Sequence, residues 1–225
     1  MFAINHAATA LVVKKKYPQA PLWLLLISVQ LMEMLWVVFN YLGLEYSSTN
    51  ATVSSVLDVN LSHMPYSHSV FSTLVVAFIA WLVLSKWFHK PKIALAVILA
   101  ISSHIILDLL THTQDIALSP FQENEKLGLG LYGIPMMAFI IETLYGVLCW
   151  WIYQGSKLLL IIIVLFNLVN ITFFSTALIG PEFLLANEPL LLTSIVLVQI
   201  VVTLTLIGVF SRKNSAIKPA SIIIP

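Results

Sequence analysis

The sequence predicts an all-α integral membrane protein, a single membrane domain built as a bundle of about six transmembrane helices. Of its 225 residues, 60% are hydrophobic and only 9% are charged, whereas about a quarter of the residues of a soluble domain are charged. The apolar residues gather in long runs, each able to cross the ~30 Å of hydrocarbon in a bilayer. Apart from Lys126, the basic residues fall before the first run, after the last run and in alternate loops between them, which is typical of a multi-pass membrane protein.

Six segments are long and apolar enough to span a bilayer. We expect the first four, together with the N-terminal segment, to form a helical core over residues 1–155 that holds the ionisable groups within the membrane. Residues 156–225 should add two scaffold spans, whose Asn167 and Asn170 favour hydrogen bonds between helices, and a short cytoplasmic tail. The predicted spans are residues 21–44, 69–87, 93–110, 131–153, 158–179 and 190–210.

The order of charged loops predicts the orientation of these spans. The loops without a basic cluster contain mainly Asp and Glu. The positive-inside rule therefore predicts a multi-pass protein of the cell membrane with both termini in the cytoplasm. The net charge of +1 gives no basic surface for nucleic acid, so the expected partner is the lipid bilayer. The basic residues that set the orientation are Lys14, Lys15, Lys16, Lys86, Lys90, Lys92, Lys157, Arg212, Lys213 and Lys218.

The third predicted span carries the most informative residues of the chain. His104, Asp108 and His112 follow one another at intervals of four, so their side chains share one face of a helix. Hydrocarbon disfavours each such group by ~2.5–3.5 kcal/mol on insertion scales, and intramembrane ionisable residues therefore indicate function. Histidine and aspartate turned away from lipid on one face are ligand types that a divalent metal requires.

Other ionisable groups lie at a similar depth in neighbouring spans. His63 and His68 flank Pro65 where the first outer loop enters the second span, and Glu33 and Glu142 lie in the middle of the first and fourth spans. Taken singly, each has an ordinary structural interpretation, as a boundary histidine or a neutral carboxylic acid. A buried carboxylate is protonated or needs a cation, and a metal provides that cation. Together the groups predict a metal site.

His6 has two interpretations. The charge order places the N-terminal segment on the cytoplasmic side, away from the outer ends of the second and third spans. His6 can join the other histidines only if residues 1–13 form a re-entrant segment whose backbone is covered by other helices. Otherwise His6 is a surface residue.

In this order, the residues resemble the LexA-regulated, membrane-bound metal-dependent hydrolase family, the YdjM-like proteins. The resemblance covers about the first 155 residues and implies a hydrolase. Glu33 departs from the family pattern, which has aspartate there, and this shifts the carboxylate by one methylene. The Ser-His-x-x-x-Asp element is also distantly similar to zinc-dependent phospholipase C. The matching elements are His6, Gln30-Leu31-Met32-Glu33, Pro65-Tyr66-Ser67-His68-Ser69, Ser103 to Asp108, Thr111-His112, Gly128 to Leu131, and Glu142.

The preferred hypothesis is a metal-dependent hydrolase that works in or at the membrane on a lipid or phosphoester substrate. The mixed nitrogen and oxygen ligand set suits zinc or another divalent metal, as one or two ions. The expected core ligands are His68, His104 and Asp108. Glu33, His63 and His6 are expected as further ligands, with Glu142 or His112 as a general base or a group that orients a ligand.

Two other hypotheses use the same residues. Intramembrane His, Asp and Glu also line the pathways of transporters and of ion or proton conduits, although the sequence shows no internal repeat typical of transporters. A closed site with four protein ligands would instead hold a structural metal in a protein without catalytic activity.

Overall fold

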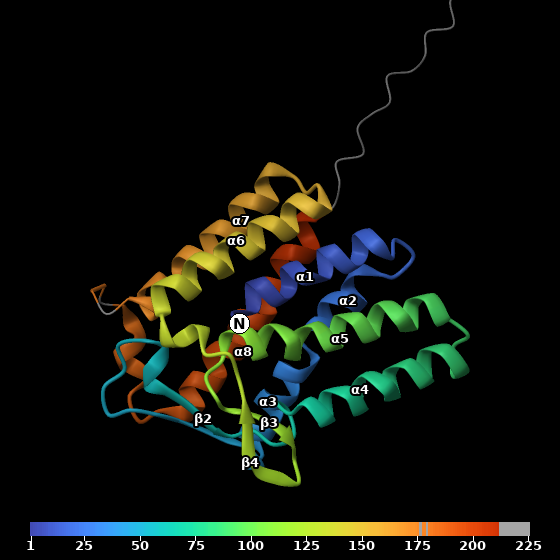
Figure 1. Cartoon of the computed structure of the whole chain (residues 1–225). Coiled ribbons are helices and arrows are strands. Elements are labelled where there is room, and N and C mark those ends of the chain that lie inside the picture. The colour runs from blue at the N-terminus through green and yellow to red at the C-terminus, as the bar shows by residue number, and fades with distance from the viewer. Residues whose placement is uncertain (176, 179, 212–225) are drawn as a thin grey trace, which may run out of the picture.

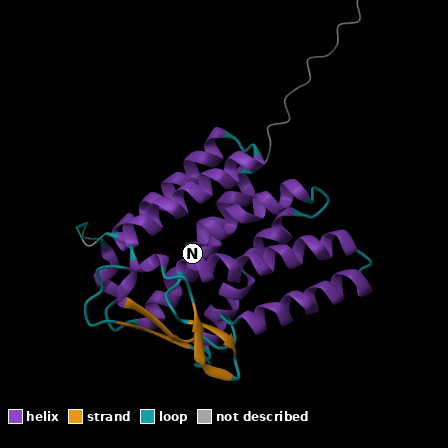
Figure 2. Cartoon of the chain, in the orientation of Figure 1, coloured by secondary structure: helices purple, strands orange, loops and turns teal. Residues whose placement is uncertain are grey.

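The structure is a computed structural model that describes residues 1–175, 177–178 and 180–211. The predicted basic tail, with Arg212, Lys213 and Lys218, lies outside these residues. Helices make up most of the described chain (Figure 2). The α-helices are α1 (Ala3–Lys16), α2 (Leu22–Val29), α3 (Leu31–Tyr41), α4 (Val70–Leu82), α5 (Pro91–Thr111), α6 (Pro135–Tyr153), α7 (Lys157–Val169) and α8 (Pro189–Phe210). Short helical turns are η1 (Val56–Asp58), η2 (Val83–Trp87), η3 (Leu131–Gly133), η4 (Ile171–Phe174) and η5 (Pro181–Leu185).

Four of the predicted spans appear as helices long and apolar enough to cross a membrane. They are α4 continued by η2, α5, α6 and α8. The first predicted span differs from a single helix, because α2 and α3 meet at an angle of 51°. The fifth is also shorter than expected, since α7 has 13 residues. Length and composition in the described chain therefore support four spans, or five if the bent pair counts as one, in place of six.

The break between α2 and α3 occurs at Gln30. Its side-chain amide donates a hydrogen bond of 2.8 Å to the carbonyl of Ala3 in α1, so this side chain ties the break to the neighbouring helix. The last carbonyls of a helix have no donor within that helix. The carbonyl of Val29, at the end of α2, is therefore available to another partner, and it accepts from His104.

Helix α1 lies inside the bundle (Figure 1). Its 14 residues reach ~21 Å, which is less than the ~30 Å of a bilayer core. It packs against α2, α5, α6 and α8, and alanines on its surface allow these helices to approach closely. His6 is 1% exposed. The structure therefore agrees with the interpretation in which other helices cover the N-terminal segment, and His6 is not a surface residue.

Two antiparallel hairpins are the departure from the all-α prediction. Strands β1 (Tyr46–Thr49) and β2 (Val59–His63) form the first, and β3 (Ile116–Ser119) and β4 (Gln122–Leu127) form the second. Both lie at one end of the bundle, whereas the turns from α1 to α2, from α4 to α5 and from α6 to α7 lie at the other end (Figure 1). The predicted basic loops within the described chain therefore gather at one end.

An apolar core holds the helices together at the end opposite the hairpins. It combines residues of α1, α2, α5, α6, α7 and α8. The two asparagines of the last spans do bind other helices, as predicted. Asn167 is hydrogen-bonded to Asn5 in α1 at 2.9 Å, and Asn170 accepts from Gln199 in α8 at 3.0 Å. The division at residue 155 stays a prediction, since α7 and α8 pack on the same core as α1.

Candidate metal centre

Four residues from three parts of the chain bring ligand atoms to one place. Glu33 lies in the first turn of α3, His68 stands just before α4, and His104 and Asp108 are one turn apart on α5. One ligand atom from each lies within 4.8 Å of every other. Of these four residues, His68, His104 and Asp108 are buried, while the side chain of Glu33 is 20% exposed. The sequence singled out all four, and the fold makes them neighbours.

The distances within this group leave little room for anything but a small cation. His104 Nε2 is 3.0 Å from Asp108 Oδ2 and 3.5 Å from Glu33 Oε2. His68 Nε2 is 3.2 Å from Glu33 Oε2 and 3.8 Å from Asp108 Oδ2. Two imidazole nitrogens thus face two carboxylate oxygens across a shared centre.

The far side of His104 fixes which nitrogen points into this centre. His104 Nδ1 is 2.9 Å from the carbonyl oxygen of Val29. A carbonyl can only accept a hydrogen bond, so Nδ1 carries the proton and Nε2 of the neutral ring is a bare lone pair. Metal-binding histidines in proteins are usually held in this way by an acceptor behind the ring.

His68 is held in the same manner by a two-step chain of hydrogen bonds. The carboxylate of Glu45 accepts from the backbone N–H groups of Tyr66 and Ser67, at 2.7 and 2.8 Å, and from the Ser67 hydroxyl at 2.5 Å. Because that hydroxyl proton goes to Glu45, the Ser67 oxygen accepts from His68 Nδ1, 2.9 Å away. The lone pair of His68 Nε2 then faces the centre as well.

This arrangement fits a bound metal ion. Two lone pairs directed at two carboxylates repel unless the rings are protonated or a cation lies between them. Among the described residues, His104 Nε2 and Asp108 Oδ2 are buried side-chain atoms without a hydrogen-bond partner, although they lie close together. Buried polar atoms are rarely left in this state. A metal ion would satisfy both, and two imidazoles with two carboxylates are a donor set that suits zinc.

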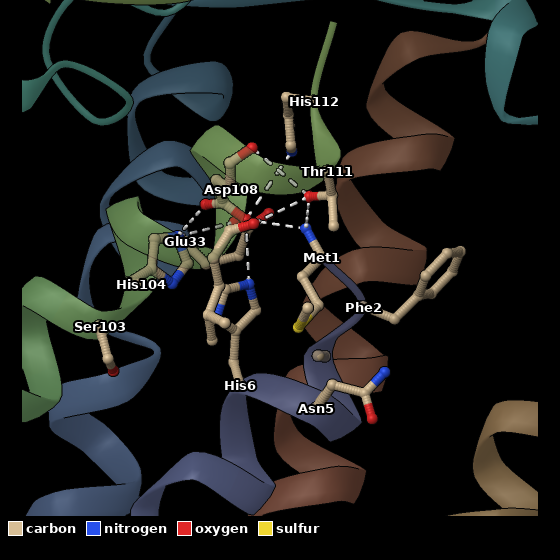
Figure 3. Close-up of polar contacts among 12 residues, drawn as sticks. Met1, Phe2, Asn5, His6, Glu33, Ser103, His104, Asp108, Thr111 and His112 are labelled. Carbon is tan, nitrogen blue, oxygen red and sulfur yellow. Dashed lines mark hydrogen bonds and ion pairs between the residues drawn. The ribbon is translucent and has the colours of Figure 1, made fainter. Parts of the chain in front are cut away.

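The other oxygen of Asp108 has partners of its own (Figure 3). His6 Nε2 is 3.1 Å and His112 Nε2 is 3.8 Å from Asp108 Oδ1. The Met1 ammonium is 2.7 Å from the same oxygen and donates to Thr111 at 3.0 Å. Two further histidines of the predicted site, His6 and His112, therefore lie near the same carboxylate on its second side.

Glu142 has a different place in the structure. Its carboxylate accepts hydrogen bonds from the backbone N–H of Phe2 and from the side-chain amide of Asn5, both at 2.9 Å, and from the Tyr132 hydroxyl at 3.0 Å. Two of these donors belong to the start of α1. The geometry therefore makes Glu142 the residue that positions α1, and with it His6.

The structure places His63 apart from the other histidines. It lies at the end of β2 in the first hairpin, and its ring stacks on Tyr46 with centroids 4.9 Å apart. A turn between β2 and α4, closed by a hydrogen bond of 3.2 Å from the backbone N–H of His68 to the carbonyl of Met64, separates the buried His68 from His63 in the hairpin.

Comparison with known families agrees with these residues. The model of the YdjM inner membrane protein family matches residues 7–179. The chain belongs to this family. No curated protein and no solved structure matches it. The matched segment includes Glu33, His68, His104 and Asp108, and it begins one residue after His6. As a member of the YdjM family the chain is an inner membrane protein, which agrees with its apolar helices and their contact with the bilayer.

A cavity of about 470 Å³ adjoins the centre in this member of the YdjM family. Glu33, His68, His6 and His112 are among the residues that line it. Further lining residues come from α3, α8 and the first hairpin, and many of these are apolar. They include Trp36, Leu57, Leu61, Met64, Leu192 and Val196.

Sequence reasoning missed the residues that orient the histidines. Glu45, 1% exposed, supports His68 through Ser67, and Asp115 supports His112. Ser67 stands within an element that resembles the YdjM family, so a signal for it was present. Glu45 appeared only as an acidic loop residue, because a hydrogen bond across 22 residues leaves no periodic pattern in a sequence. Asp115 was also treated only as an acidic loop residue, although it lies three residues from His112.

Proposed function

We propose that this YdjM-family protein is a metal-dependent hydrolase embedded in the membrane. The observation that carries the proposal is the pair of histidines, His68 and His104, each oriented by an acceptor behind the ring and each directing Nε2 at two carboxylates beside a cavity. A divalent ion, with zinc as the best fit, would be held by His68, His104, Asp108 and Glu33.

The chemistry of such a site suits hydrolysis. A bound divalent ion supplies a nucleophile from water at neutral pH and polarises the oxygen of the bond that is cleaved. The chain's own residues would keep the ligands in place, since Val29 and the Ser67–Glu45 pair fix the two rings. Glu33 and His68 are the proposed ligands that border the cavity, so substrate would approach from their side.

The cavity supports a lipid or lipid-linked phosphoester as the substrate class. An amphiphile needs a polar centre for its headgroup and an apolar wall for its chain, and sites for such ligands are largely apolar with a few polar groups. Here Glu33 and His68 are among the polar lining residues, and Trp36, Met64 and Val196 are among the apolar ones. With both termini in the cytoplasm, as the basic loops predict, the cavity would open toward the outer leaflet.

The arrangement favours hydrolysis over conduction. A conduit needs polar groups along a path across the membrane. In the described chain, the region between the centre and the basic end is filled by an apolar cluster that includes Ala7, Leu11, Leu25 and Ala100. The polar groups thus gather at the hairpin end beside one cavity.

Metal content and hydrolysis measured together test the proposal. Purified wild-type protein in detergent should contain a divalent metal by elemental analysis and should release product from a panel of phospholipid and isoprenoid-phosphate substrates. His104→Ala and Asp108→Ala should lose the hydrolysis and the ion bound at the four-residue centre. His63→Ala is the matched control and should keep both, since His63 lies in the hairpin. Metal-free protein that stays without metal after zinc is added would overturn the proposal, as would metal-loaded protein inactive on every phosphoester.

A further inference from the structure

We infer that a second divalent ion binds on the other side of Asp108, held by Asp108 Oδ1, His6 Nε2 and His112 Nε2. The inference rests on the proposed function, because it makes the Asp108 carboxylate a bridge between two ions. It assigns a metal-binding role to the N-terminal helix α1, which the four-residue centre does not use.

The four histidines are arranged as two stacked pairs around one carboxylate. The rings of His6 and His104 stack with centroids 4.2 Å apart, and those of His68 and His112 lie 29° from parallel at 6.2 Å. Each pair sends one Nε2 to each oxygen of Asp108. Oδ2 has His104 at 3.0 Å and His68 at 3.8 Å, whereas Oδ1 has His6 at 3.1 Å and His112 at 3.8 Å. The nitrogen–oxygen distances on the two sides of Asp108 are therefore nearly the same.

His112 also has the support behind its ring that the first pair of ligands has. Its Nδ1 lies 3.2 Å from Asp115 Oδ1 and 3.4 Å from Asp115 Oδ2. An ionised carboxylate can only accept, so the proton is on Nδ1 and the Nε2 lone pair faces Asp108. A carboxylate behind a histidine is a common support for a metal ligand, because it raises the basicity of the ring.

The second oxygen of Asp108 is also paired with a positive charge. The Met1 ammonium lies 2.7 Å from Oδ1, and the side chain of Asp108 is only 1% exposed. A divalent ion that binds His6 and His112 would take over this role and displace the ammonium. His6 and His112 both line the cavity, so the second ion would face substrate. Two ions bridged by one carboxylate can together clamp the oxygens of a phosphoester, as in other two-metal sites.

The number of ions bound by the wild-type protein is the first test. Titration of metal-free protein with Co²⁺, followed by absorption spectroscopy and elemental analysis, should give two ions per chain. His112→Ala should bind one ion and keep the first site, since Glu33, His68, His104 and Asp108 Oδ2 remain. His104→Ala should instead weaken the first site. A wild-type protein that binds one ion, with an affinity unchanged in His112→Ala, would overturn this inference while leaving the proposed function intact. Binding of no ion would overturn both.

A milder variant avoids any loss of folding. Asp115→Asn removes the carboxylate behind His112 but leaves every proposed ligand in place. It should weaken binding of the second ion by about 10- to 100-fold and leave the affinity for the first unchanged. Asp58→Asn is the matched control, because Asp58 is an acceptor in the first hairpin, bonded to Asn50 and Ser54, and both affinities should stay as in wild type. Equal affinities for both ions in Asp115→Asn and wild type would contradict the role of His112.

Discussion

At the scale of single residues, the orientation of each histidine is set from behind the ring. His104 uses a backbone carbonyl that the break at Gln30 leaves without a helical donor, whereas His68 uses a serine and a buried glutamate. The two supports differ in kind but produce the same result, an Nε2 lone pair at the shared centre. Metal affinity should therefore depend on residues that never contact the ion.

The Ser67 hydroxyl gives a direct test of this dependence. Ser67→Ala removes the acceptor for His68 Nδ1 and a donor to Glu45, so the ring loses its fixed tautomer and orientation. We expect the affinity for the first metal ion to fall by about 10- to 100-fold, measured by competition with a chromogenic chelator.

Ser103→Ala is the matched control for that variant. Ser103 precedes His104 on α5, but its hydroxyl bonds to the carbonyl of Ala100 in the same helix at 2.7 Å. Its removal should leave metal affinity unchanged. An equal loss of affinity in both variants would mean that serine removal disturbs the helices generally, and that the Ser67–Glu45 chain does not orient His68.

At the scale of elements, α1 connects the site to the bundle. Its first residues bind Glu142 and its Asn5 binds Asn167, so α6 and α7 both hold it in place. Such close packing depends on Gly146 in α6, where an added Cβ would lie 2.8 Å from Asn5 Oδ1 and from Ile163 Cγ2. α1 should therefore tolerate almost no increase in volume on this face.

A pair of glycine variants isolates this packing. Gly146→Ala and Gly208→Ala both lie within long helices and gain similar helix propensity. An added Cβ at Gly208 meets only Leu26 Cδ1 at an ordinary 3.6 Å. We expect Gly146→Ala to be less stable than Gly208→Ala by about 1–3 kcal/mol, because overpacking forces neighbours to move. Thermal unfolding in detergent, followed by circular dichroism, measures the difference, and equal melting temperatures would contradict close packing of α1 on α6.

Hydropathy and spacing predicted some elements and missed others for physical reasons. Long apolar runs identified α4, α5, α6 and α8, and the four-residue spacing on α5 correctly placed His104 and Asp108 on one face. Hydropathy does not register the bend at Gln30, since a single glutamine barely changes the average of a long apolar run. The hairpins were missed because their strands have only four to six residues, so periodicity has little length in which to appear.

At the scale of the whole molecule, the sequence does not give the distances in space between residues that are far apart in the chain. Only the fold supplies these distances. Glu33, His68 and Asp108 were predicted as partners from their type and depth, and the fold brings them together. Whether His6 joins them depended on the depth of α1, and the charge rule assigns a side of the membrane without assigning a depth. The packing of α8 against α1 also leaves the predicted core and scaffold in direct contact.

Orientation in the membrane is the last property that the whole molecule predicts. The basic turns lie at one end and the hairpins at the other (Figure 1), so the positive-inside rule predicts that the hairpins and the cavity lie outside the cytoplasm. Single cysteines introduced into a Cys149→Ala background test this orientation. The background lacks the one native thiol, which is buried. Ala51→Cys in the first hairpin should react with a membrane-impermeant maleimide in cells whose inner membrane is intact. Lys90→Cys, in the turn between α4 and α5, should react only after that membrane is permeabilised. The reverse pattern of labelling would show the opposite orientation, with the metal centre near the cytoplasmic leaflet. That result would exclude an outer-leaflet lipid as the substrate.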